Sequence, residues 1–210
     1  MTRLSRHIVL FSAASAFALG ACSREAEAPA NDVAMGNEMI VDNSLNIDAM
    51  ADSNGMTGAG AAQSFNFAGA DGTALGSVSV SDAADGASMT VNASGMPAGV
   101  HGIHLHEKGL CDGPKFESAG GHWNPGAKKH GRDNPQGAHL GDLANLEVGA
   151  NGTASASFTV AGAMMASGST MLADADGTSL VVHAKRDDYK TDPSGASGDR
   201  IACAVIAAPK

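Results

Sequence analysis

The sequence predicts an all-β domain from Gln63 to Lys210, and three observations lead to this class. Apolar and polar residues alternate with a period of two in several short segments, turn dipeptides separate those segments, and no long amphipathic helical pattern occurs among them. Short strands at regular spacing are typical of a sandwich or a barrel. Aromatic residues make up only 4% of the chain, so we expect a core built mainly from Val, Ala, Leu and Ile.

Four segments carry the alternation most clearly. In chain order they are Ser-Phe-Asn-Phe (64–67), Gly-Ser-Val-Ser-Val (76–80), Ala-Ser-Met-Thr-Val-Asn (87–92) and Thr-Ala-Ser-Ala-Ser-Phe-Thr-Val (153–160). Successive side chains of a strand point to opposite faces, so each segment is expected to bury one face. Asp71-Gly72, Asp85-Gly86 and Asn151-Gly152 lie between the segments, and these dipeptides favour tight turns.

Two segments interrupt the strand pattern. Residues 107–141 form a long stretch rich in Gly, Pro, Lys and Asn, and residues 184–199 form a shorter, highly charged one. A loop as long as the first is usually functional in a compact domain. Because His122, His130, His139 and Cys111 all lie in it, we expect a metal and a disulfide to order it.

Six of the eight histidines have spacings that indicate two adjacent metal sites. They are His104, His106, His122, His130, His139 and His183, and Asp142 follows three residues after His139. His104 and His106 are two residues apart on an expected strand, so their rings point to the same side. Imidazoles with one carboxylate suit zinc and copper better than calcium or magnesium. These donors suffice for two metals if one imidazole is shared.

Six short blocks resemble those of copper–zinc superoxide dismutases of the bacterial secreted type. In order they are His-Leu-His (104–106), Gly-Gly-His-Trp-Asn-Pro (120–125), Lys-His-Gly (129–131), His-Leu-Gly-Asp-Leu (139–143), Leu-Val-Val-His (180–183) and Gly-Asp-Arg-Ile-Ala-Cys (198–203). The resemblance covers Gln63 to Lys210. It implies an eight-stranded Greek-key β-barrel with a long metal-binding loop and a charged loop. It also implies disproportionation of superoxide, the small-molecule substrate, to O₂ and hydrogen peroxide.

The same resemblance assigns the ligands, with one copper and one zinc per subunit. The copper ligands would be His104, His106, His122 and His183, and the zinc ligands would be His122, His130, His139 and Asp142. His122 would therefore bridge the two metals and carry a proton in catalysis. Four protein ligands make the closed coordination of a structural zinc, whereas a hydrolytic zinc keeps one position for water.

Further roles are carried over position by position. Arg200 matches the active-site arginine of the family and would attract the anionic substrate; the alternative is a surface arginine paired with Asp199. Asp187 matches a carboxylate that links a copper histidine to a zinc histidine, here expected to be His104 and His130, with Asp188 as the rival.

The sequence leaves two possible roles for each of three other residues. His101 is structural or solvent-exposed. Trp123 and Phe116 contribute either to a subunit contact or to packing within the chain. A monomer and a homodimer both stay open.

The cysteines fit an exported protein. In the family the pair that matches Cys111 and Cys203 forms a disulfide, and the alternative is two buried free thiols. A bridge between them would close a loop of about ninety residues, worth about 4–5 kcal/mol in the chain-entropy estimate.

The N-terminal 62 residues are expected to serve export and tethering. Residues 1–22 combine two arginines with an apolar run and end in Leu-Gly-Ala-Cys, which resembles a lipobox. Cys22 would then be lipidated and hold the protein at the cell envelope or periplasm, the alternative being an ordinary secretory signal. Residues 23–62 carry seven acids, one base and no aromatic residue, so we expect a disordered acidic tether.

The formal net charge of −9 and the absence of a basic segment argue against nucleic acid as a partner. A membrane is expected only through the lipid anchor at Cys22. Two alternative functions stay open at this point. A non-catalytic copper-binding or metallochaperone-like domain would be expected to lack a copper ligand or the arginine. A zinc hydrolase would need an open zinc and a general base, for which Glu107 is the only nearby candidate.

Overall fold

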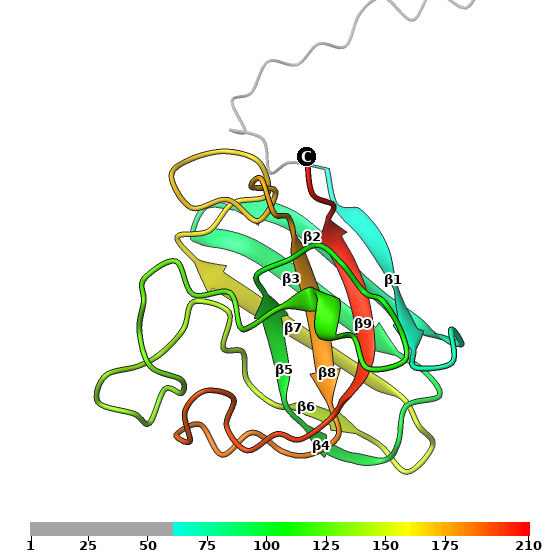
Figure 1. Ribbon diagram of the computed structural model, residues 1–210. Helices are drawn as coiled ribbons and strands as arrows, with labels where there is room; N and C mark the ends of the chain where they lie inside the picture. Colours follow the sequence, from blue (N-terminus) through cyan, green and yellow to red (C-terminus); the bar gives the residue numbers. More distant parts are fainter. Residues whose placement is uncertain (1–60) are drawn as a thin grey trace, which may run out of the picture. The chain divides into compact units, whose positions relative to one another are not determined.

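Antiparallel strands account for nearly all regular structure in residues 61–210, the part of the chain that the computed structural model describes (Figure 1). The strands are β1 (Gln63–Gly69), β2 (Ala74–Ala83), β3 (Gly86–Ala93), β4 (Gly99–His101), β5 (Ile103–His106), β6 (Leu146–Val148), β7 (Ala154–Ala161), β8 (Thr178–His183) and β9 (Arg200–Ala207). One 3₁₀ turn, η1 (Glu117–Ala119), is the only helical element in this part. The predicted all-β class is confirmed, and the four alternating segments are β1, β2, β3 and β7.

The strands form a seven-stranded sheet in the order β5-β8-β9-β1-β2-β3-β7, and β4 pairs separately with β6. The large sheet curls on itself (Figure 1), as expected of a Greek-key barrel. Nine strands are counted instead of eight because β4 and β5 are one extended segment interrupted at Gly102. At this break the Gly102 N–H donates to the Lys185 carbonyl, and the Gly102 carbonyl accepts from the His183 N–H, both at 2.8 Å.

The core fills the inside of the curled sheet with aliphatic side chains. Ile103 and Leu105 of β5, and Leu180 and Val182 of β8, are fully buried there. The side chains between them in sequence point to the outer face, because side chains alternate along a strand. This alternation puts His104, His106 and His183 outside the core, under the loops.

The outer face of β8 is covered by the first part of the long loop. Val181 packs with Phe116, Ala119 and Cys203 in a second small core, and Cys203 forms a disulfide with Cys111. The bridge expected from the resemblance is therefore present, and the free-thiol alternative is wrong. A loop with few apolar residues is thus held over β8 by one covalent bond and a few buried contacts.

The three residues for which the sequence left two possible roles are all buried. Phe116 and Trp123 are 1% and 4% exposed, so both pack within the chain rather than on an exposed subunit contact. His101 is 3% exposed, and its ring nitrogens lie 2.8 Å from the His183 carbonyl and 2.9 Å from the Pro97 carbonyl. It is structural, and the solvent-exposed alternative is wrong.

The expected signal segment, the lipidated Cys22 and the acidic tether lie outside the described residues, apart from the last two positions of the tether. Within residues 61–210, no helix has the length and apolar character needed to cross a membrane.

Candidate metal centre

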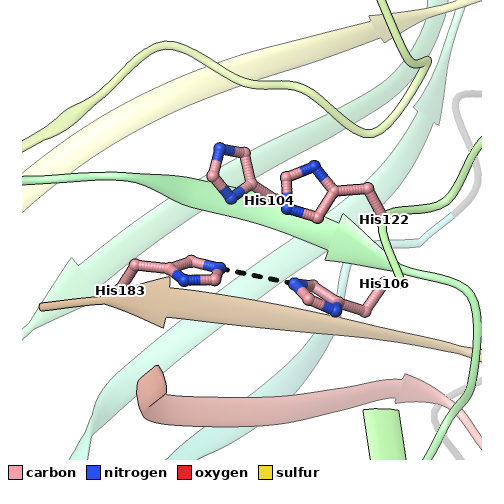
Figure 2. Close-up of side chains that lie close together, drawn as sticks. All are labelled: His104, His106, His122 and His183. Atoms are coloured by element: carbon pink, nitrogen blue, oxygen red, sulfur yellow. Dashed lines mark hydrogen bonds between the residues drawn. The ribbon is translucent and has the colours of Figure 1, made fainter. Parts of the chain in front are cut away.

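Four histidines converge on the outer face of β5 and β8 (Figure 2). The first cluster consists of His104 and His106 from β5, His183 from the end of β8, and His122 from the long loop. One ring nitrogen of each lies within 4.8 Å of the others, and all four residues are buried. His122 reaches the cluster because the loop returns to β5, where it forms an antiparallel bridge with His106.

Hydrogen bonds fix which nitrogen of His106 and His183 points into the first cluster. His106 Nδ1 donates to the Gly120 carbonyl at 3.0 Å, and His183 Nδ1 donates to the Gly198 carbonyl at 3.2 Å. A neutral imidazole has one N–H, so each Nε2 keeps its lone pair. These two Nε2 atoms face each other at 3.4 Å (Figure 2). Two opposed lone pairs are favourable only with a cation between them.

The other two members present nitrogens with no hydrogen-bond partner in the described part of the chain. They are His104 Nδ1 and His122 Nε2, both buried. Their opposite nitrogens are occupied, His104 Nε2 by Asp187 at 2.8 Å and His122 Nδ1 by Asp142 at 2.9 Å. An unpaired buried polar atom is costly, and a bound metal removes this cost. Four inward imidazole nitrogens fit copper or zinc.

A second cluster gathers around one carboxylate oxygen. Asp142 Oδ1 lies 2.9, 3.0 and 3.1 Å from the Nδ1 atoms of His122, His130 and His139. Asp142 Oδ2 accepts from the Gly131 and His139 N–H groups, which ties the loop to its own ligands. Three imidazoles and one carboxylate are the closed donor set of a structural zinc site. The His122 ring belongs to both clusters, with Nε2 toward the first and Nδ1 toward the second.

A buried carboxylate also connects the two clusters from behind. Asp187 Oδ2 lies 2.8 Å from His104 Nε2, and Asp187 Oδ1 lies 3.0 Å from His130 Nε2. Such outer hydrogen bonds fix ring orientation, so that the opposite nitrogens point inward. The rival Asp188 is exposed and binds Thr191. The structure therefore places Asp187, and not Asp188, between the clusters.

Arg200 stands at the start of β9 beside the first cluster. Its guanidinium donates to the Phe116 carbonyl at 2.5 Å and to the Gly120 carbonyl at 2.6 Å. No ion pair joins it to Asp199 in the described structure, so the surface-pair alternative is wrong. A cavity of about 240 Å³ leads to the cluster, and it is lined by His106, Gly121, His122, His183, Pro193, Ser194, Gly198 and Arg200.

The protonation states of the metal-free protein differ between the two clusters, and His130 must lose a proton before it can bind a metal. Burial, partly offset by the Asp142 hydrogen bond, lowers the pKa of His122 to about 4, and burial lowers the pKa of His183 to about 3. Both rings are therefore neutral near pH 7. Burial also lowers the pKa of His130, but Asp142 and Asp187 outweigh it and raise that pKa to about 9. Burial raises the pKa of both carboxyls, but their histidine hydrogen bonds hold them below the usual range, so both are ionised.

Gly120 is a site residue that sequence reasoning did not single out. Its carbonyl accepts from both His106 and Arg200. Its φ of 75° lies in the left-handed region, and an added Cβ would lie 2.7 Å from the Glu107 carboxylate. Glu107 in turn accepts from the Gly121 N–H at 3.0 Å, so it braces the loop. The available signal was the Gly-Gly pair directly before His122.

Two more residues that were not foreseen support Asp187: Asn145, directly before β6, and Gly195 of the charged loop. The Asn145 side chain accepts from the Asp187 N–H at 2.9 Å and donates to the Asp187 carbonyl at 3.0 Å. Gly195 has a φ of 65°, and an added Cβ would collide with the Asp187 carboxylate. Neither residue stands in a recognisable motif, because the Asn145 contact joins distant segments and the Gly195 contact depends on how the charged loop folds back on itself.

Comparison with known proteins gives consistent matches. The family model described as copper/zinc superoxide dismutase (SODC) matches residues 74–206. The superoxide dismutase-like protein YojM of Bacillus subtilis is 41% identical over 65% of this chain and 71% of its own length. A superoxide dismutase [Cu-Zn] of Caulobacter vibrioides is 42% identical over 65% and 80%. The crystal structure of a SOD-like protein from Bacillus subtilis covers 71% of this chain and 99% of its own, with 38% identity and a TM-score of 0.67.

Proposed function

The chain belongs to the copper/zinc superoxide dismutase family, and from this membership we propose that it disproportionates superoxide to O₂ and hydrogen peroxide at the two joined histidine clusters. The observation that carries the proposal is the His122 ring, which presents an unpaired Nε2 to the first cluster and Nδ1 to the second. A single imidazole shared in this way couples a redox site to a structural one.

The two clusters are the ligand sets we assign. Copper would be held by His104, His106, His122 and His183, and zinc by His122, His130, His139 and Asp142. Bound copper supplies one-electron redox chemistry, and bound zinc keeps the loop and the shared ring in place. The support is the inward nitrogens described above, not the spacing alone.

The chain's own groups do the remaining work. Arg200 is anchored by two carbonyls at the cavity wall, so its positive charge faces an entering anion in a fixed place. The cavity of about 240 Å³ has room for a small anion. Reduction of superoxide to hydrogen peroxide consumes protons, and we infer that the shared His122 ring, whose Nε2 has no hydrogen-bond partner among the described residues, holds and releases one.

The purified full-length chain, supplied with copper and zinc, provides the test. We expect one copper and one zinc per chain and rapid superoxide dismutation that requires copper. Both metals without activity would indicate a non-catalytic copper-binding domain instead. Zinc uptake with copper refused would mean that the first cluster is not a copper site.

Export and anchoring belong to the same proposal. We infer that residues 1–22 direct export, that Cys22 carries a lipid, and that residues 23–62 tether the enzyme domain of residues 63–210 at the cell envelope. The support is the Leu-Gly-Ala-Cys sequence and the acidic composition that follows it. Cys22→Ser should move the protein from the membrane fraction to the soluble one, and unchanged fractionation would contradict the anchor. Sedimentation of the same soluble variant decides between a monomer and a homodimer.

A further inference from the structure

Tyr189, the only tyrosine of the chain, ties the charged loop to the long loop. Its backbone N–H donates to Asp187 Oδ1 at 2.6 Å, and its carbonyl accepts from the Asp133 N–H at 3.0 Å. One residue thus contacts both the carboxylate that joins the clusters and the loop that carries three of the histidines.

The Tyr189 side chain makes two further contacts. Its hydroxyl accepts from the Asn145 N–H at 2.8 Å, and the Arg132 guanidinium lies 3.7 Å from the centre of its ring. The backbone φ is 62°, a conformation that a bulky residue rarely adopts. The contacts of the hydroxyl with Asn145 and of the ring with Arg132 hold Tyr189 in this backbone conformation.

Asn145 connects the tyrosine to the Asp187 backbone. Its amide side chain bonds both the N–H and the carbonyl of Asp187, while its own N–H is bonded to the Tyr189 hydroxyl. Asp187 is therefore fixed by its backbone through Asn145 and by its carboxylate through Tyr189. The two carboxylate oxygens then meet His104 on one side and His130 on the other.

We propose that Tyr189 is a positioning residue, whose hydroxyl keeps Asp187 oriented between the two clusters and thereby fixes His104 and His130 together. This inference rests on the proposed copper–zinc site. Its consequence is that a change at one hydroxyl, remote from both clusters, alters the environment of both metals at once.

The experiment compares the full-length parent with Tyr189→Phe, each loaded with copper and zinc. The variant keeps the ring beneath Arg132 and removes only the hydroxyl. We expect zinc release to a colorimetric chelator to become about three- to tenfold faster, the range expected from one lost hydrogen bond. We also expect a shifted copper(II) electron paramagnetic resonance spectrum, because the His104 ring is no longer held as firmly.

Lys190→Ala is the matched control, because this neighbouring side chain is exposed and makes no hydrogen bond or ion pair in the described structure. It should release zinc at the parent rate with the parent spectrum. Tyr189→Leu also removes the Arg132 contact, and it should release zinc faster than Tyr189→Phe.

Two results would overturn the proposal. One is a Tyr189→Phe protein with the parent's release rate and spectrum. The other is faster release that merely follows global unfolding, measured by circular dichroism, with an unchanged copper spectrum. A parent that fails to take up copper and zinc would instead refute the proposed function, before any variant is compared.

Discussion

Arg200 shows how much of the site depends on a single anchored side chain. Both of its terminal nitrogens donate to loop carbonyls, and the residue is partly exposed where it lines the cavity. A guanidinium stays charged at any working pH and offers several fixed donors. It therefore provides a permanent local positive charge in a chain with a formal net charge of −9.

We predict that Arg200→Glu lowers the second-order rate of superoxide dismutation by at least about tenfold, because a local charge of the wrong sign opposes the entry of an anion. Pulse radiolysis at low ionic strength measures this rate. Lys115→Gln, a change of an exposed charge that shares a neighbouring surface pocket with Arg200, is the control and should have a small effect. A rate for Arg200→Glu within twofold of the parent would remove the steering role.

Ser179 offers a test of stability rather than activity. Its side chain is fully buried, and its hydroxyl has no hydrogen-bond partner among the described residues. Removing an unsatisfied buried polar group is neutral or favourable. We predict that Ser179→Ala leaves the free energy of unfolding equal or raises it by about 1 kcal/mol, as measured by urea denaturation. A loss above about 1 kcal/mol would show that the hydroxyl has a partner.

At the residue scale, the candidate metal ligands could be predicted from the sequence, but the residues that hold Asp187 in place could not. His104, His106 and His183 could be proposed because histidine is rare and its spacing on strands has a geometric meaning. Asn145 and Gly195 could not, since an asparagine and a glycine in loops are common. Their roles come only from contacts with Asp187 across some forty and eight residues of chain, respectively.

The first part of the long loop is an element held at three points. The Cys111–Cys203 disulfide fixes it to β9, Glu107 bonds the Gly121 N–H, and Arg200 bonds two of its carbonyls. It has little apolar surface of its own, so its order depends on these links. The arginine's position in turn depends on the loop.

We therefore predict that replacing Cys111 and Cys203 together by alanine lowers both stability and activity. The chain-entropy estimate for a closed loop of this size is about 4–5 kcal/mol, and the carbonyls that orient Arg200 become mobile. Thermal unfolding and dismutation assays on the metal-loaded protein measure the two effects. Cys22→Ser, which leaves the bridge intact, is the control, and a double variant as stable and active as this control would contradict the prediction.

The second cluster predicts a pH dependence in protein stripped of its metals. Asp142 and Asp187 raise the pKa of His130 to about 9, above the ordinary value of 6.5. A raised pKa in the folded state stabilises the protein fully below pH 6.5, and this contribution is lost as the pH rises toward 9. Denaturation at pH 6 and pH 9.5 should show the loss. Zinc-loaded protein and a His130→Gln variant should lose less stability between these two pH values than the metal-free parent. The same loss in all three proteins would contradict the raised pKa of His130.

Prediction at the element scale succeeded where one face of a strand is buried. Alternation identified β1, β2, β3 and β7, whose inward residues form the core. It did not identify β6, whose three residues are too short for a period to be read. Nor did it identify the break at Gly102, which arises because the chain pairs with β6 before this residue and with β8 after it. The loop paths depend on contacts that no local pattern encodes.

The whole molecule poses an electrostatic problem, because a negatively charged chain has to attract an anion. Salt screens both the long-range repulsion and the local attraction. Screening the repulsion raises the rate at which the anion reaches the site, whereas screening the attraction lowers that rate. We predict that the local field at Arg200 is decisive, so that the rate of the parent falls as ionic strength rises from about 10 to 150 mM. Stopped-flow or pulse-radiolysis rates over this range test it. A rate that rises with salt would mean that the overall negative charge dominates.

The fold class was predictable for the whole domain because few architectures satisfy many short alternating strands without helices. The convergence of the candidate metal ligands was predictable because imidazole donors are chemically distinctive and their order resembles that of a family. The Asp187 link and the Cys111–Cys203 bridge, which bring together segments distant in the chain, were expected only from the family resemblance, because no local sequence pattern encodes them.

The Gly120 carbonyl accepts hydrogen bonds from His106 and from Arg200 at the same oxygen. The guanidinium proposed to attract the anion and the ring proposed to bind copper are thus held by the same carbonyl oxygen. Substitutions that widen the cavity mouth would shift the Gly120 carbonyl oxygen. They would thereby change the orientation of the His106 ring without replacing any of the proposed metal ligands. In this scaffold, a change in what the cavity admits is therefore expected to change the geometry of the proposed copper site as well.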